Sequence, residues 1–142
     1  KTGCQVETLD FVSGVQSKAN ELYSLSYGSS FECTLVRAAG QSESRCEFVM
    51  PNNLNGFCFV DTTKSFNPDD IKFQDVRTLV VGLGKSANKN LFFSTSKGDS
   101  CKADPVLVRR ITTNGAVCLS IKDKIPSFVM ENKGNLVEVK KP

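Results

Sequence analysis

The sequence predicts an α+β fold, in which an N-terminal amphipathic helix packs on a predominantly antiparallel β-sheet stapled by disulfides. Three observations predict it. Apolar residues near the N-terminus recur at three- and four-residue steps, short alternating apolar segments separated by turn residues follow, and six cysteines occur without any Cys-x-x-Cys pair. The 142 residues favour a single domain, 1–142, which is long enough to bury a core.

The first periodic segment, about residues 6–25, is expected to form the helix. Its apolar stripe consists of Val6, Leu9, Val12, Val15, Ala19 and Leu22. Gly14 weakens the helix interior and therefore predicts a kink or a close packing contact. The run from Tyr27 to Ser30, which contains Gly28, is expected to stop the helix.

The β-rich region, residues 31–142, is expected to contain about nine short strands. They span 31–37, 46–50, 57–60, 76–83, 90–95, 106–112, 116–121, 127–130 and 136–139. The second and third strands form a candidate hairpin around the loop 51–56, and residues 113–115 and 132–135 are tight-turn signals. Most of the ten phenylalanines are expected in the core. Phe92 and Phe93 point to opposite faces of one strand, so one of them is expected at the surface or at a contact.

The cysteines predict the cellular compartment. An even number of widely spaced cysteines is typical of three structural disulfides formed in an oxidising environment, with buried free thiols as the alternative. The six are Cys4, Cys33, Cys46, Cys58, Cys101 and Cys118. Sequence alone leaves 15 connectivities open; the sequential pairing Cys4–Cys33, Cys46–Cys58 and Cys101–Cys118 is the one we favour. The expected location is extracellular or at the cell surface, although no Asn-x-Ser/Thr glycosylation site supports it independently.

Composition narrows the classes of function. The chain has no histidine and no tryptophan, which removes histidine-based triads, histidine-ligated zinc and the commonest general base. We therefore expect no enzyme, no catalytic residue, no cofactor and no metal site. No apolar run is long enough to span a membrane, and Lys1 is not followed by a signal-peptide core, so any export signal is expected outside these residues.

Charge is unevenly distributed along the chain. Residues 1–70 contain five Lys/Arg and nine Asp/Glu (net −4), and residues 71–142 contain 13 and six (net +7), which sum to the overall +3. One interpretation is a solvated surface with scattered charges, and the other is a polarised subunit whose basic part meets the acidic part of a neighbour. Nucleic-acid binding is not expected, because the basic residues form no stripe with interleaved aromatics.

Three motifs resemble catalytic or binding signatures. Gly82–Ser86 resembles the end of a phosphate-binding loop, but Leu79 stands where that loop needs glycine, so a glycine-rich turn between strands is expected. Ser94 and Lys97 have the Ser-x-x-Lys spacing of penicillin-recognising enzymes without the helix that it requires. Asp61, Asp69 and Asp70 offer oxygen ligands for calcium, but Asn-Pro-Asp-Asp is more typical of a turn or a helix N-cap.

The layout resembles the soluble part of type IV pilin-like proteins, in which an N-terminal helix precedes an antiparallel sheet that carries disulfides. Three stretches are similar to exported pilin-like proteins of archaea: Pro51–Asp61 (PNNLNGFCFVD), Cys118–Ile121 (CLSI) and Phe128–Val139 (FVMENKGNLVEV). The resemblance implies a helix that continues upstream into an apolar anchor, which later packs in a filament core. That apolar segment is not among these 142 residues.

The first functional hypothesis is therefore a non-enzymatic extracellular structural protein, a pilin-like or surface-filament subunit whose helix packs on the sheet or on a neighbour. The second is a secreted protein-interaction module, such as an adhesin, an inhibitor or an effector, that recognises its partner through the loops 51–56 and 96–105. A secreted hydrolase with acidic or Ser/Lys catalysis is the third. The expected partners are proteins, either further copies of this chain or a surface or host protein.

Overall fold

The computed structural model describes residues 3–36, 45–51, 54–84, 88–95, 103–120, 122 and 126–142, with the backbone alone for 3–7. These residues include two α-helices and one 3₁₀-helix: α1 Gly3–Tyr23, η1 Pro68–Asp70 and α2 Gln74–Leu83. The strands are β1 Ser30–Val36, β2 Cys46–Val49, β3 Leu54–Val60, β4 Leu91–Thr95, β5 Ile111–Thr113, β6 Ala116–Ser120, β7 Ser127–Asn132 and β8 Val137–Lys140. None of the described helices has the length and apolar character needed to span a membrane.

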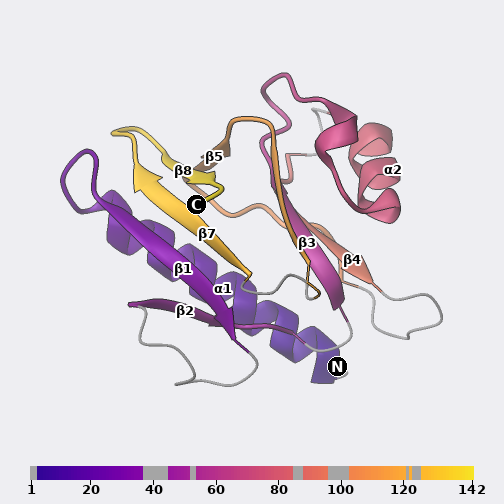
Figure 1. Cartoon of the computed structure of the whole chain (residues 1–142), viewed down its shortest axis with the longest axis horizontal. Helices are drawn as coiled ribbons and strands as arrows, with labels where there is room; N and C mark the ends of the chain where they lie inside the picture. The colour runs from indigo at the N-terminus through magenta and orange to yellow at the C-terminus, as the bar shows by residue number, and fades with distance from the viewer. Residues whose placement is uncertain are drawn as a thin grey trace.

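The strands form two sheets rather than one (Figure 1). The large sheet has the strand order β2-β1-β7-β8-β5 and the small sheet has the order β4-β3-β6. Pairing is antiparallel except between β1 and β2 and between β5 and β8. The predicted α+β class, with an N-terminal helix and mostly antiparallel strands, is therefore confirmed.

Helix α1 lies behind the large sheet and contributes to the main core (Figure 1). Its buried positions are Thr8, Phe11, Val15, Ala19 and Leu22. The predicted stripe is thus confirmed at Val15, Ala19 and Leu22 but not at Leu9, which is 46% exposed, and Phe11 occupies the core in addition. The aromatic ring of Phe11 contacts rings of β2, β3 and β4, which explains why the helix turns this side inward. The expected close contact at Gly14 is present, since a Cβ there would lie 3.4 Å from the Phe48 ring.

The large sheet buries one face and exposes the other. Along β7 and β8, buried residues alternate with half-buried ones, the pattern of an antiparallel sheet with one solvated face. The inner face contributes Cys33, Leu35, Phe48, Phe128, Met130, Val137 and Val139 to the main core. The outer face carries polar and charged residues, including Glu131 and Lys140.

The small sheet buries both of its faces. On one face, Phe57 and Phe59 of β3 belong to the main core with α1. On the other face, Cys58 and Val60 belong to a second core that includes Val76 and Val80 of α2. Phe92 and Phe93 follow the same rule: each points to a different face of β4, and both are buried. The expectation that one of them is exposed is wrong, because α2 and η1 cover the second face.

The segment 76–83, predicted as a strand, is helix α2. Its apolar residues recur at helical steps, and Val76 and Val80 are buried while Val81 is 60% exposed. Gly84 ends the helix with a positive φ of 67°, and its N–H donates to the Val80 carbonyl. The many valines favour a strand by propensity, but the small sheet offers an apolar face that only the helical arrangement covers.

Two disulfides are described, Cys33–Cys46 and Cys58–Cys118. Each joins directly opposed residues of neighbouring strands, with Cα–Cα distances of 4.5 Å and 4.0 Å. The sequential pairing is therefore wrong: Cys33 bonds to Cys46 instead of Cys4, and Cys118 bonds to Cys58 instead of Cys101. Strand register decides this, because Cys46 and Cys58 stand in different sheets. The Cys4 side chain and Cys101 lie outside the described part of the chain.

The predicted hairpin of residues 46–60 is also wrong. β2 pairs in parallel with β1 in the large sheet, whereas β3 lies in the small sheet. Of the 51–56 loop, Leu54–Gly56 begins β3, and Pro51 is buried. The turn at 113–115 joins β5 to β6 and so connects the two sheets, and the turn at 132–135 joins β7 to β8 in the predicted hairpin. The segment 106–112 contributes only a bridge at Val106 and the start of β5.

Candidate interaction surface

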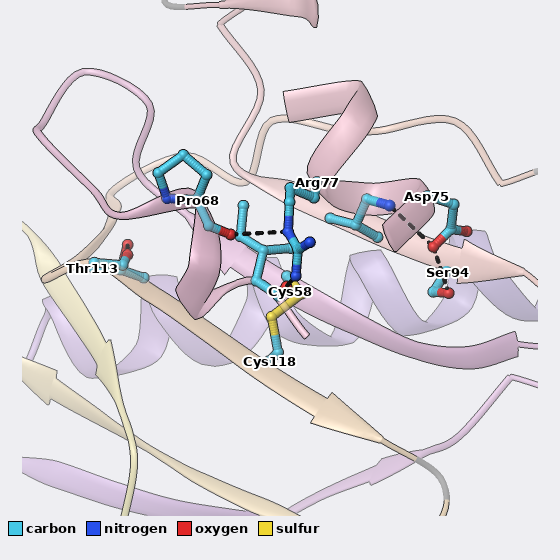
Figure 2. Close-up of a disulfide and its surroundings, with 10 residues drawn as sticks. Cys58, Pro68, Asp75, Arg77, Ser94, Thr113 and Cys118 are labelled. Atoms are coloured by element: carbon cyan, nitrogen blue, oxygen red, sulfur yellow. Dashed lines mark hydrogen bonds between the residues drawn. A yellow bond between two sulfur atoms is a disulfide. The ribbon is translucent and has the colours of Figure 1, made fainter. Parts of the chain in front are cut away.

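The Ser-x-x-Lys candidate is a structural contact. Ser94 of β4 is buried, and its hydroxyl donates a 2.8 Å hydrogen bond to Asp75 Oδ1 of α2. The Thr95 N–H donates to the other oxygen of the same carboxylate. Figure 2 shows this contact beside the Cys58–Cys118 disulfide, together with Arg77, whose Nε donates to the Pro68 carbonyl. These bonds hold α2 and η1 on the small sheet. Lys97 lies outside the described residues.

The aspartates predicted as possible calcium ligands have different structural roles. The Asp61 carboxylate accepts hydrogen bonds from the Thr112 hydroxyl at 2.6 Å and from the Thr63 hydroxyl and N–H. Burial raises the pKa of Asp61, but these bonds and the charge of Lys64 lower it, and the net pKa lies below the ordinary value. Since Asp61 follows β3 and Thr112 lies on β5, this contact ties the two sheets together.

Asp69 and Asp70 lie in η1, where the Asn67 side chain accepts a hydrogen bond from the Asp69 N–H. The predicted turn or N-cap is therefore confirmed. Within the described ranges, no three Asp, Glu or Cys side chains converge as metal ligands would. Gly82 and Leu83 form the last turn of α2, so the glycine-rich segment ends a helix instead of connecting two strands; Lys85 and Ser86 fall outside the described residues.

The charge difference between the two halves of the chain does not produce two oppositely charged bodies. β1 from the acidic half pairs with β7 from the basic half, so acidic and basic segments interleave in the large sheet. On its outer face, Glu131 forms ion pairs with Lys133 and Lys140, and Lys133 also approaches Glu138. The hydrogen bonds of these pairs lower the pKa of Glu131 and raise that of Lys133.

A different candidate surface lies at the C-terminal end of α1. We call this surface the Tyr27 pole. It is formed by the α1–β1 loop, the β7–β8 turn and the residue before β5. Its side chains are Tyr23, Leu25, Tyr27, Arg110 and Leu136. Both loops lie at the end of the molecule opposite to the start of α1 (Figure 1). Tyr27 is 74% exposed, Leu25 46% and Leu136 38%.

One buried side chain, Asn132 of β7, builds this pole. Its amide donates to the carbonyls of Leu22 and Leu25 at 2.9 Å, where α1 ends and its carbonyls lack helical partners. Its side-chain oxygen accepts from the Gly134 N–H at 2.7 Å. Its backbone exchanges hydrogen bonds with Gly28 and Ser29. Asn132 thereby adds side-chain bonds to the β1–β7 pairing that places the two loops side by side.

Sequence reasoning missed the Tyr27 pole and assigned recognition elsewhere. Of the loop 51–56, Pro51, Leu54 and Gly56 are buried, and the half-buried Asn55 donates its side-chain amide to the Thr95 carbonyl. Of 96–105, only 103–105 are described, and they include the exposed Asp104. The signals for the pole are the segments Tyr27–Gly28 and Asn132–Asn135, which the sequence predicts only as a helix stop and a tight turn. That two chain reversals meet is a tertiary fact.

Comparison of the chain with protein-family models, with curated proteins and with solved structures finds no match.

Proposed function

We propose that this chain is a non-enzymatic extracellular structural protein, a pilin-like or surface-filament subunit. The observation that carries the proposal is the arrangement of α1. The helix buries one side on both sheets and leaves Leu9 46% exposed on another side, where it is available to a neighbouring subunit. A contact between copies through this side of α1 would remove the Leu9 side chain from water.

The disulfides support an extracellular location. Both described bridges connect adjacent strands, one in each sheet, and their sulfur-bearing residues are buried. Bridges of this kind persist in oxidising compartments. The polar side chains that resemble catalytic groups support a structural role as well, since Ser94 and Asp61 are occupied in bonds between elements of the fold.

Negative-stain electron microscopy and size-exclusion chromatography of the oxidised protein test this proposal over a range of concentrations and salt. Filaments or concentration-dependent oligomers are the expected result. Leu9→Lys should abolish them, while Leu83→Lys, which alters an exposed leucine of the other helix, should not. A monomer under all conditions contradicts the filament-subunit proposal.

The second candidate is a secreted protein-interaction module. The Tyr27 pole favours it, because exposed tyrosine and leucine side chains on well-anchored loops are typical of binding sites. A monomeric protein that binds a partner through this pole is the expected result for this candidate.

A further inference from the structure

We propose that the Tyr27 pole binds a protein segment in which an apolar side chain stands next to a carboxylate. The inference extends the interaction-module candidate by naming the chemistry of the partner. It rests on three features of the pole: exposed apolar side chains, loops held by hydrogen bonds, and an arginine without an acidic partner among the described residues.

The apolar side chains of the pole lie on two joined loops. The Tyr27 ring lies over the β7–β8 turn, since a Cβ placed on Gly134 would be 3.6 Å from it. Leu136 ends the same turn, where its carbonyl accepts the Lys133 N–H. The Leu25 carbonyl is bound by Asn132, which also holds Gly134. These three exposed residues therefore lie on neighbouring loops, and burying their side chains against a partner removes apolar area from water.

The pole is pre-organised. Asn132 joins the α1–β1 loop to the β7–β8 turn by the side-chain and backbone bonds described above. Both Gly28 and Gly134 have positive φ values, 86° and 95°, which fix the reversals of the two loops. A surface already held in one conformation loses little entropy on binding, so a few side chains suffice for measurable affinity.

Arg110 supplies the charge. Its guanidinium carbon lies 4.0 Å from the centre of the Tyr23 ring, and its carbonyl accepts the Val137 N–H beside Leu136. None of the ion pairs found among the described residues includes Arg110. A guanidinium stacked on an aromatic ring keeps its N–H edge for a carboxylate, which it binds with two parallel hydrogen bonds.

The charges around the pole favour a protein segment over a lipid surface. Lys133 lies in the β7–β8 turn and interacts electrostatically with Tyr27, but it is paired with Glu131 and approaches Glu138. The pole thus presents one arginine beside apolar side chains, whereas binding to anionic membranes draws on clusters of several basic residues. Tyrosine and arginine are also the residue types enriched in protein interfaces.

The test is an NMR titration of the ¹⁵N-labelled oxidised protein with the peptide acetyl-Gly-Phe-Asp-Phe-Gly-amide. We expect saturable shifts of the amides of Leu25, Tyr27, Arg110 and Leu136. A peptide with lysine in place of aspartate should bind about fivefold more weakly, because it loses the bond to Arg110. Absence of saturable shifts, equal binding of both peptides, or shifts confined to another surface would overturn the proposal.

Matched variants locate the effect. Arg110→Gln should lower affinity for the aspartate peptide to that of the lysine peptide, and Arg109→Gln, at the neighbouring exposed arginine, should leave it unchanged. Tyr27→Ala should abolish binding while the remaining amide spectrum stays as in the parent. Binding to phosphatidylglycerol vesicles that Tyr27→Ala removes would contradict the proposal and assign the pole to a lipid surface.

These outcomes are separable from the fate of the filament proposal. Arg110→Gln and Tyr27→Ala leave Leu9 unchanged, so filaments that persist in both variants support assembly through α1 whatever the peptides do. A parent protein that assembles but shows no saturable peptide binding overturns only the inference about the pole.

Discussion

The two sheets of this protein are buried to different extents. The large sheet packs one face on α1 and leaves the other to solvent, whereas the small sheet lies between the main core and the α2 layer. In β3, six of the seven residues are buried, and in β7 buried and half-buried residues alternate. The comparison shows that the small sheet is covered on both faces, whereas one face of the large sheet remains exposed to solvent.

The largest expected effect is the loss of stability on removal of a disulfide, and this loss differs between the two disulfides. Removing Cys58–Cys118 by a double alanine substitution should lower the free energy of unfolding by about 4 kcal/mol, and removing Cys33–Cys46 by about 3 kcal/mol. The first bridge spans 60 residues of sequence and the second 13, so the first restricts the unfolded chain more. Urea unfolding of both variants measures the difference, and a larger loss for Cys33–Cys46 would contradict it.

The next effect tests the tight packing of the small sheet. Gly56→Ala should cost about 3 kcal/mol, because its Cβ would collide with the Leu119 carbonyl and lie 2.5 Å from the Phe73 ring. The matched control is Gly82→Ala, since nothing lies within 4 Å of a Cβ there in α2. This control should stabilise by about 0.5–1 kcal/mol, as alanine does in a helix. Thermal unfolding of the two variants compares them, and equal shifts would argue against the packing.

Two adjacent valines test whether α2 covers the small sheet. Val80 is 1% exposed and Val81 60% exposed. Val80→Ala should lower stability by about 2 kcal/mol, whereas Val81→Ala should change it by less than about 0.5 kcal/mol. Denaturant titration of both variants provides the measurement. Similar costs at the two positions would mean that α2 does not pack on the sheet as described.

The smallest expected effect concerns the hydrogen bond from Thr112 to Asp61, which connects the two sheets. Because hydrogen bonding holds the folded-state pKa of Asp61 below its ordinary value of 3.8, its ionisation stabilises the fold above that pH, and this contribution is lost as pH falls through the folded pKa. Unfolding free energies measured from pH 7 to pH 2 should therefore fall less for Asp61→Asn than for the parent. Asp10→Asn, at an exposed residue of α1, is the control. If the free energy of unfolding fell with pH in Asp61→Asn as much as in the parent, the stabilising role of the Asp61 contact would be contradicted.

Helix α1 and the β7–β8 hairpin could be predicted from the sequence because their signals are local: the apolar period of the helix and the turn residues Asn132–Asn135. The rest of the large sheet could not, since β2 pairs with β1 and not with the strand that follows it in the sequence. The small sheet was harder, since an unbroken apolar strand such as β3 does not reveal its partners. Helix α2 was predicted as a strand because its valines have high β-propensity. The predicted disulfide pairing was wrong because the pairing depends on which sheet each strand joins.

The Tyr27 pole could not be predicted from the sequence, for a related reason. Tyr27 and Leu136 are separated by most of the chain, and the pairing of β1 with β7 and the hydrogen bonds of Asn132 bring their loops together. Nothing in the local sequence marks an asparagine at a strand end as the residue that binds the end of a distant helix.

The sequence predicts three disulfides, and Cys4 and Cys101 remain as the expected third pair. A thiol count on the unfolded, non-reduced protein tests this prediction.

Native-state hydrogen exchange resolved to single amides tests the difference between the sheets most directly. β3 and β7 are both flanked by a strand on each side, so they differ mainly in the cover of their faces. We predict that the amides of β3, from Phe57 to Phe59, exchange only through global unfolding, and that those of β7, from Val129 to Glu131, exchange faster through smaller openings. Equal protection of the two strands, or faster exchange in β3, would contradict the account.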